Sequence, residues 1–161
     1  MAIEIERKFL LKSDAWRAQV HRFQRMQQSY LGGTHCSMRV RIAGESAFLN
    51  IKSRELGVKR QEFEYPLPLA DANALLLLAE APGIDKVRHY VKIDRFTFEI
   101  DEFLGANLGL IVAELELDDE HANFPKPEWL GVEVTHEARY YNSNLVDLPY
   151  ASWAMRFGLT S

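Results

Sequence analysis

The feature that most constrains the fold is an alternation of charged and apolar residues, seen first in the segment 4–10, Glu-Ile-Glu-Arg-Lys-Phe-Leu. Successive side chains of a β-strand point to opposite faces, so Glu4, Glu6 and Lys8 would share one face. Two carboxylates about 7 Å apart on one strand face repel each other unless a cation lies between them. The segment therefore predicts a strand with one charged and one apolar face.

The same arrangement returns along the chain with paired charges of one sign. Glu114 and Glu116 repeat the acidic pair late in the sequence, and Arg39 and Arg41 form a basic counterpart. In a single strand such alternation is typical of a solvated outer face. Repeated like-charge pairs are less easily explained in this way, because each is unfavourable by roughly some tenths of a kcal/mol. The set favours a face that binds metal ions through its acids and a polyanion through its bases.

Size and composition limit the class of protein. With 161 residues, of which 47% are hydrophobic, the chain is expected to form one domain over residues 1–161 with its own core. The net charge of −4 argues against non-specific nucleic-acid binding. The single cysteine, Cys36, excludes an internal disulfide and a cysteine zinc site. Neither an apolar signal core nor a membrane span is visible, so we expect a cytoplasmic protein.

Strand-like runs dominate the sequence, and helices are few. Strands are predicted at about 2–12, 25–31, 37–43, 46–53, 59–66, 86–93, 95–102 and 110–117, with a short one near 131–135. Tight turns are expected at 43–46 and 94–95, and a loop at 105–109. Ser13 resembles a helix N-cap, and a helix capped by Asp71 is predicted at about 72–80. Short helical turns are predicted at 127–130, 142–148 and 153–157. The pattern indicates an α+β chain, mainly antiparallel β, whose sheet closes on itself.

A closed sheet explains where the charged faces would lie. A barrel of about eight strands has an interior that side chains normally fill. Filling it with glutamate, arginine and lysine requires a wider, wet lumen and compensating ions, because unpaired buried charges are unfavourable. The apolar strand faces would then point outward, where the helices must cover them. The expectation is an inverted barrel, polar inside and apolar outside.

The ordered set of motifs resembles the CYTH superfamily, the triphosphate tunnel metalloenzymes. The resemblance spans most of the chain and rests on Glu4-x-Glu6-x-Lys8, Arg39-x-Arg41, Lys52, Arg60-x-Glu62-x-Glu64, Lys86-x-Arg88, Asp101, Glu114-x-Glu116, Val134-Thr135 and Arg139-Tyr140-x-Asn142-Ser143. It implies a closed eight-stranded antiparallel barrel, a triphosphate tunnel with a charged interior and flanking helices. This fold agrees with the inverted barrel expected from the alternation.

The resemblance also implies roles for the charged residues in metal-dependent triphosphate hydrolysis with Mg²⁺ or Mn²⁺. Hard cations prefer carboxylate oxygens, so the expected metal ligands are Glu4, Glu6, Glu62, Glu64, Glu114 and Glu116. Arginine and lysine suit phosphate oxygens, so the expected phosphate-binding residues are Lys8, Arg39, Arg41, Lys52, Lys86 and Arg88. The expected catalytic residues are Lys8, Arg41 and Asp101, with Asp101 orienting a basic residue or a metal-bound water.

The resemblance leaves the substrate open. Inorganic tripolyphosphate is the first choice, because the short chain has no additional base-recognition module. A class IV adenylate cyclase would need a purine pocket, and a thiamine triphosphatase would need an aromatic or acidic patch at the tunnel mouth. The acidic pairs argue against a non-catalytic polyphosphate-binding module. No nucleic-acid or membrane partner is expected; a homodimer, the number of metal ions, and whether Tyr30, Arg54 and Arg60 line the tunnel stay open.

Overall fold

The computed structural model describes residues 3–79 and 81–154. Its strands are β1 (Ile3–Leu11), β2 (Val20–Gly32), β3 (Cys36–Ala43), β4 (Ser46–Ser53), β5 (Lys59–Leu67), β6 (Ile84–Ile93), β7 (Phe96–Phe103), β8 (Ile111–Glu116) and β9 (Leu130–Glu133). The α-helices are α1 (Leu69–Leu76), α2 (Asn142–Asp147) and α3 (Tyr150–Trp153), and the 3₁₀ turns are η1 (Ala15–Gln19), η2 (Gly105–Asn107) and η3 (Ala138–Tyr140). In this described part, no helix is long and apolar enough to cross a membrane.

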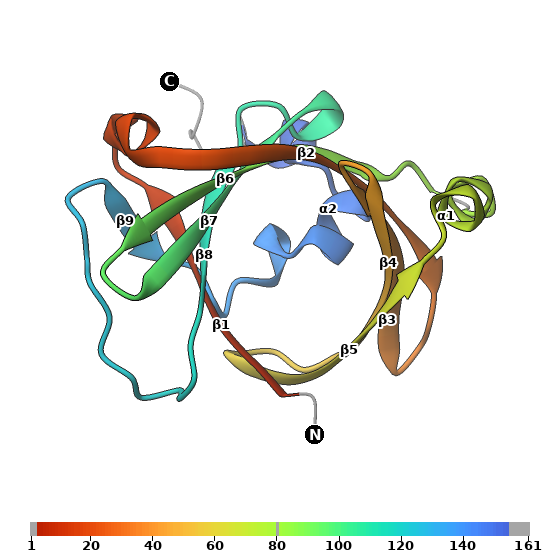
Figure 1. The fold of residues 1–161 in the computed structure, drawn as a ribbon, viewed down its shortest axis with the longest axis horizontal. Coiled ribbons are helices and arrows are strands. Elements are labelled where there is room, and N and C mark those ends of the chain that lie inside the picture. Colours follow the sequence, from red (N-terminus) through yellow and green to blue (C-terminus); the bar gives the residue numbers. More distant parts are fainter. Residues whose placement is uncertain (1–2, 80, 155–161) are drawn as a thin grey trace.

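Strands β1 to β8 form a closed antiparallel barrel, as the sequence predicts (Figure 1). The sheet runs in the order β5-β4-β3-β2-β6-β7-β8-β1-β9, and an additional pairing of β1 with β5 closes the ring. Every ladder is antiparallel. Each strand therefore turns alternate side chains into the barrel, which is what the charge alternation requires.

Strand β1 shares one of its edges between two partners. Its first residues pair with β5, from Ile3 opposite Gln61 to Ile5 opposite Lys59, and its last residues pair with β9. The chain after β9 stays attached to β1, because the amide of Val134 donates to the Lys8 carbonyl at 2.8 Å. This attachment brings residues 134–154, here called the closing segment, to one end of the barrel.

The closing segment packs on an apolar part of the barrel interior. Ile84, Phe103 and Val112 are buried and lie an even number of residues from the inward-facing charges of their strands, so they share the inner face. They cluster with Tyr140, Leu145, Tyr150 and Trp153 of the closing segment. In Figure 1, α2 lies within the ring of strands. The interior is thus charged along most of its length, but apolar and filled at one end, which the inverted-barrel expectation did not include.

Two further apolar clusters cover the outside of the barrel, as expected. Phe98, Ile100 and Leu115 point outward from β7 and β8 and pack with Trp16 of η1 and with Trp129. On the opposite side, α1 buries Ala72 against Val40 and Ala47 of β3 and β4. Burial of such side chains supplies most of the stabilisation of the fold.

All nine predicted strands are present, but one is much longer than predicted. Strand β2 begins at Val20 rather than near residue 25, and its polar first half pairs with β6, with Phe23 opposite His89 and Gln24 opposite Arg88. The long neighbouring strand satisfies the backbone groups of a segment whose own side chains give little strand signal. The turns at Gly44 and Asp94 are confirmed, and both residues have positive φ.

The helix boundaries were predicted less well than the strands. Ser13 does not cap a helix: Asp14 takes the N-cap position of the 3₁₀ turn η1, although Ser13 Oγ accepts a hydrogen bond from the Ala15 amide. Helix α1 begins after Pro68, so Asp71 lies in its first turn, where its charge suits the helix dipole. Residues 127–130 form the short turn predicted there, closed by a hydrogen bond from the Leu130 amide to the Pro127 carbonyl at 3.0 Å. Helix α2 is confirmed, whereas α3 begins at Tyr150, before the predicted start at residue 153. Residues 155–157 lie outside the described part.

Candidate active site

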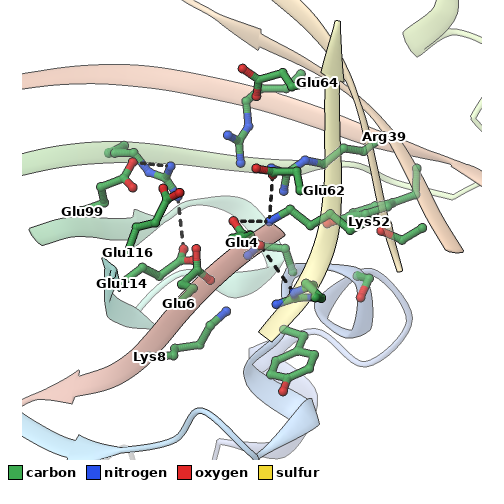
Figure 2. Close-up of a pocket in the computed structure, with 18 residues that line it drawn as sticks. Glu4, Glu6, Lys8, Arg39, Lys52, Glu62, Glu64, Glu99, Glu114 and Glu116 are labelled. Atoms are coloured by element: carbon green, nitrogen blue, oxygen red, sulfur yellow. Dashed lines mark hydrogen bonds and ion pairs between the residues drawn. The ribbon is translucent and has the colours of Figure 1, made fainter. Parts of the chain in front are cut away.

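The charged inner faces of the strands surround a cavity of about 360 Å³ (Figure 2). Within residues 3–79 and 81–154, seven of the residues that line it are glutamates: Glu4, Glu6, Glu62, Glu64, Glu99, Glu114 and Glu116. Six are basic: Lys8, Arg39, Arg41, Lys52, Arg60 and Arg88. The cavity therefore holds nearly balanced charges of both signs, at a density that is rare inside proteins.

The register of the strands brings the predicted acids together. Glu6 lies opposite Glu116 and Lys8 lies opposite Glu114 in the pairing of β1 with β8. In the next pairing, Glu99 of β7 lies opposite Glu114. Directly opposed residues have Cβ atoms about 4.5–5.5 Å apart. Carboxylates from three adjacent strands therefore meet on one wall of the cavity.

Glu6 and Glu114 lie near each other on the paired strands β1 and β8, and each changes the pKa of the other. Burial and the negative charges of Glu114 and Glu4, together with a hydrogen bond to Glu114, raise the pKa of Glu6 well above its usual value. Burial also acts to raise the pKa of Glu114, but Lys8, the hydrogen bond with Glu6, and Arg88 hold it well below the usual value. The opposite directions of the two shifts show that two adjacent negative charges are unfavourable at this place. A cation bound between the two carboxyl groups would relieve that repulsion.

Glu116 belongs to the same wall. Burial and the charges of Glu4, Glu62 and Glu99 raise its pKa. In the described part of the chain, however, no three histidine, cysteine, aspartate or glutamate side chains are arranged so that they could hold a metal ion. Several of the carboxylates are instead paired with bases of the site, so a metal would have to draw them out of those pairs.

The guanidinium group of Arg88 is hydrogen-bonded to three carboxylates. Its Nε and Nη2 donate to Asp101 at 2.7 and 2.8 Å, and its Nη1 donates to Glu99 at 2.7 Å. A further bond joins Nη2 to Glu114 at 3.1 Å. Burial alone would lower the pKa of Arg88, but the charges of Asp101 and Glu99 raise it well above the usual value. Arg88 therefore remains charged and is held in one orientation.

Two of the predicted site residues, Lys86 and Asp101, do not line the cavity. Both are 0% exposed and lie beneath Arg88. Lys86 Nζ donates to Asp101 at 2.7 Å and to the side-chain oxygen of Asn142 at 3.1 Å. Burial lowers the pKa of Lys86 to about 7, although the charge of Asp101 opposes this shift. The charges of Arg88 and Lys86 outweigh burial and lower the pKa of Asp101. Lys86 and Asp101, here called the support, lie beneath the cavity and hold Arg88 in place.

Within residues 3–79 and 81–154, Arg39 and Arg41 form no ion pair with a carboxylate. Arg39 is 6% exposed and makes no hydrogen bond or ion pair with any residue that the structure describes. Arg41 Nε donates to the neutral side-chain oxygen of Gln28 at 2.9 Å. Burial and the charges of Arg39 and Arg88 lower the pKa of Arg41 to about 9. Buried cations without anionic partners are unfavourable, so this wall is suited to bind an anion.

The remaining bases of the cavity, Lys8, Lys52 and Arg60, contact carboxylates or an aromatic ring. Lys52 Nζ contacts Glu4 at 3.1 Å and Glu62 at 3.4 Å, and Arg60 contacts Glu4 at 3.5 Å (Figure 2). The charged groups of Lys8 and Arg60 lie over the ring of Tyr141, 5.2 and 5.4 Å from its centroid. The closing segment thus contributes directly to the cavity.

The sequence alone does not decide whether Tyr30, Arg54 and Arg60 line the tunnel. In the structure, Tyr30 and Arg60 line the cavity. Arg54 does not line it, and its guanidinium group donates to the carbonyl oxygens of Cys36 and Gly33. Further lining residues without a predicted role are Ser37, Glu99, Tyr141, Asn142 and Ser143. The alternation with Asp101 could have identified Glu99, because it places both residues on the same face.

The chain resembles known proteins both in sequence and in structure. A model of the CYTH domain family matches residues 2–147. The chain is 42% identical over 154 residues to an inorganic triphosphatase of Acetivibrio thermocellus, with 95% of this chain and 99% of the relative covered. It is 35% identical over 147 residues to an inorganic triphosphatase of Nitrosomonas europaea, with 88% and 95% covered. A crystal structure of an inorganic triphosphatase superposes with a TM-score of 0.64 at 31% identity, covering 91% of this chain and 95% of the other.

Proposed function

This chain belongs to the CYTH domain family, and on that premise we propose that it is a metal-dependent triphosphatase that cleaves the terminal phosphoryl group of inorganic tripolyphosphate. Two relatives that match most of this chain's length are named inorganic triphosphatases. The observation that carries the proposal is the pair Arg39 and Arg41, two buried cations that face a cavity lined by glutamates and form no ion pair with any carboxylate the structure describes.

The basic wall would bind the phosphate chain. The guanidinium groups of Arg39 and Arg41 offer several donors each, in a planar arrangement that matches phosphate oxygens. Lys8 and Lys52 would add point charges, and Lys52 would have to leave Glu4 to do so. Because Arg88 is already bound by three carboxylates, we propose that it contributes mainly its fixed charge.

The acidic wall supplies the carboxylates that a hard divalent cation such as Mg²⁺ or Mn²⁺ would bind, once some of them leave their present ion pairs. The neighbouring charge of Glu114 raises the pKa of Glu6, a repulsion that a cation would relieve, and Glu4 and Glu116 line the same cavity. These four glutamates would hold the metal, with Glu62 and Glu64 as further candidates, since carboxylate oxygens are the preferred ligands. When bound, the cation would neutralise phosphate charge and lower the pKa of a coordinated water.

Hydrolysis would rely on positioned charges rather than on a protein nucleophile. Lys8 and Arg41 would stabilise the charge on the phosphoryl group as it is transferred, which is the main requirement of this chemistry. Asp101 would act from beneath the lining by fixing the orientation of Arg88. We therefore assign Asp101 and Lys86 to positioning rather than to direct contact with the substrate.

A substrate panel tests the proposal. Purified protein is given tripolyphosphate, ATP or thiamine triphosphate with Mg²⁺ or Mn²⁺, and orthophosphate, pyrophosphate and cyclic AMP are measured. We expect orthophosphate from tripolyphosphate at the highest kcat/KM, and none when EDTA is in excess. Pyrophosphate with cyclic AMP from ATP would indicate a cyclase instead. Undiminished turnover in EDTA would contradict the metal assignment.

A further inference from the structure

Asn142 links the cavity to the support beneath it. The residue lines the cavity at the start of α2, and its side-chain Oδ1 accepts a hydrogen bond from Lys86 Nζ at 3.1 Å. Lys86 is fully buried and also donates to Asp101 at 2.7 Å. The side-chain amide of Asn142 therefore joins the closing segment to the buried pair of Lys86 and Asp101 beneath the cavity.

The bond to Lys86 determines how the amide of Asn142 is turned. A protonated lysine has three donors and no acceptor, so only the oxygen of the amide can face it. The other end of the amide, Nδ2, carries two donors. In the described residues, this nitrogen donates no hydrogen bond. Since the oxygen is held by a residue beneath the lining, the amide nitrogen is the polar end left for the cavity.

We propose that Asn142 donates a hydrogen bond from Nδ2 to a phosphate oxygen of the bound triphosphate, and that Lys86 is the positioning residue that turns the amide for this contact. The proposal rests on the proposed function, since it concerns the same ligand. It gives Lys86 an indirect role and adds a neutral donor to the basic residues expected to bind phosphate. A neutral donor suits this place, because the nearby carboxylates already neutralise Arg88.

Binding of tripolyphosphate by the metal-free protein tests the contact. Calorimetry is done at about pH 6, below the pKa of Lys86, which burial lowers to about 7. Asn142→Ala should raise the dissociation constant by about 10-fold, the effect of one hydrogen bond to a charged group. Asn142→Asp keeps the shape but places a carboxylate oxygen against the phosphate, so we expect an increase of about 100-fold.

Asn144→Asp is the matched control. It makes the same charge change on the same helix, but the Asn144 amide donates to the Ala138 carbonyl, and the residue does not line the cavity. We expect this variant to bind within about 2-fold of the wild type. Thermal unfolding of each variant checks that it is folded. Equal binding by Asn142→Asp and Asn144→Asp would overturn the proposal.

A double-mutant cycle tests the positioning role of Lys86. Lys86→Met should weaken binding several-fold when Asn142 is present and have a smaller effect in the Asn142→Ala background, because the two residues would act as one unit. Equal effects in both backgrounds would contradict the positioning role. If Lys86→Met does not fold, Lys86→Gln replaces it.

The outcomes separate this inference from the proposed function. Wild-type protein that binds tripolyphosphate but does not hydrolyse it with metal would contradict the proposed function and leave the Asn142 comparison valid. If the wild-type protein hydrolyses tripolyphosphate and Asn142→Asp binds it as tightly as the wild type does, only the present inference is contradicted. Wild-type protein that binds no tripolyphosphate would contradict both.

Discussion

Lys52 on β4 donates a hydrogen bond to Glu4 on β1, with 3.1 Å between Nζ and Oε1, although β5 lies between these two strands in the sheet. The bond joins an expected phosphate-binding residue to an expected metal ligand. Both are largely buried, so each compensates for the charge of the other. Binding of a metal and a triphosphate would therefore break the ion pair between Lys52 and Glu4. Lys52 would then contact a phosphate group, and Glu4 would contact the metal.

This exchange predicts opposite effects of Lys52→Gln on the two ligands. Without Lys52, Glu4 loses its nearest cation, so affinity for Mn²⁺ in the absence of triphosphate should rise by about 3- to 10-fold. Affinity for tripolyphosphate should fall, since a phosphate contact is lost. Calorimetric titration with each ligand checks both effects. A parallel decrease in both affinities would show that Lys52 does not compete with the metal.

Glu116→Gln should lower activity and raise the stability of the metal-free protein. If Glu116 is the metal ligand proposed above, its loss should reduce kcat/KM by more than about 100-fold, beyond the effect typical for residues that only support ligands. The pKa of Glu116 is raised in the folded protein, so its ionisation destabilises the fold as pH rises through that pKa.

The sign of the stability effect can be checked by its pH dependence. Thermal unfolding in EDTA should show Glu116→Gln to be more stable than the wild type at neutral pH. The difference should vanish at acid pH, where Glu116 is protonated in both the folded and the unfolded protein. A destabilised variant at neutral pH would argue that Glu116 is held by favourable contacts.

Asp101→Asn should be strongly destabilising. It leaves Arg88 and Lys86 buried without their main anionic partner, and loss of one member of a buried ion pair costs about 3–5 kcal/mol. The pKa of Asp101 is lowered in the folded protein, so its stabilising effect is present above the unfolded pKa and is lost as pH falls through the folded one. Urea unfolding at neutral and acid pH should show the difference shrinking under acid conditions.

The sequence predicted which strand faces are charged more reliably than it predicted which charges reach the cavity. The period of two places Lys86 and Arg88 on one face, and both do point inward. Periodicity does not give the position along the barrel axis, however, and Lys86 lies nearer the filled end, beneath the lining. The same limit applies to Asp101.

The contribution of the closing segment could not be predicted from local patterns. Tyr141 and Asn142 reach the cavity only because β9 pairs with the end of β1 and directs the following residues into the barrel. That pairing joins residues more than a hundred positions apart, and no strand alternation marks Tyr141 or Asn142 as inward-facing. The start of α1 was missed for a local reason, since Pro68 rather than Asp71 precedes the helix.

The central claim is that the inward face of the barrel carries the reaction, and Arg39 and Arg7 test it most directly. Arg39 faces the cavity and has no hydrogen-bond or ion-pair partner among the described residues, whereas Arg7 faces outward from β1 and binds Glu133 at 2.8 Å. We predict that Arg39→Ala lowers kcat/KM for tripolyphosphate by about 100-fold, and that Arg7→Ala stays within about 2-fold of the wild type. Equal losses in the two variants, or normal turnover by Arg39→Ala, would contradict the account.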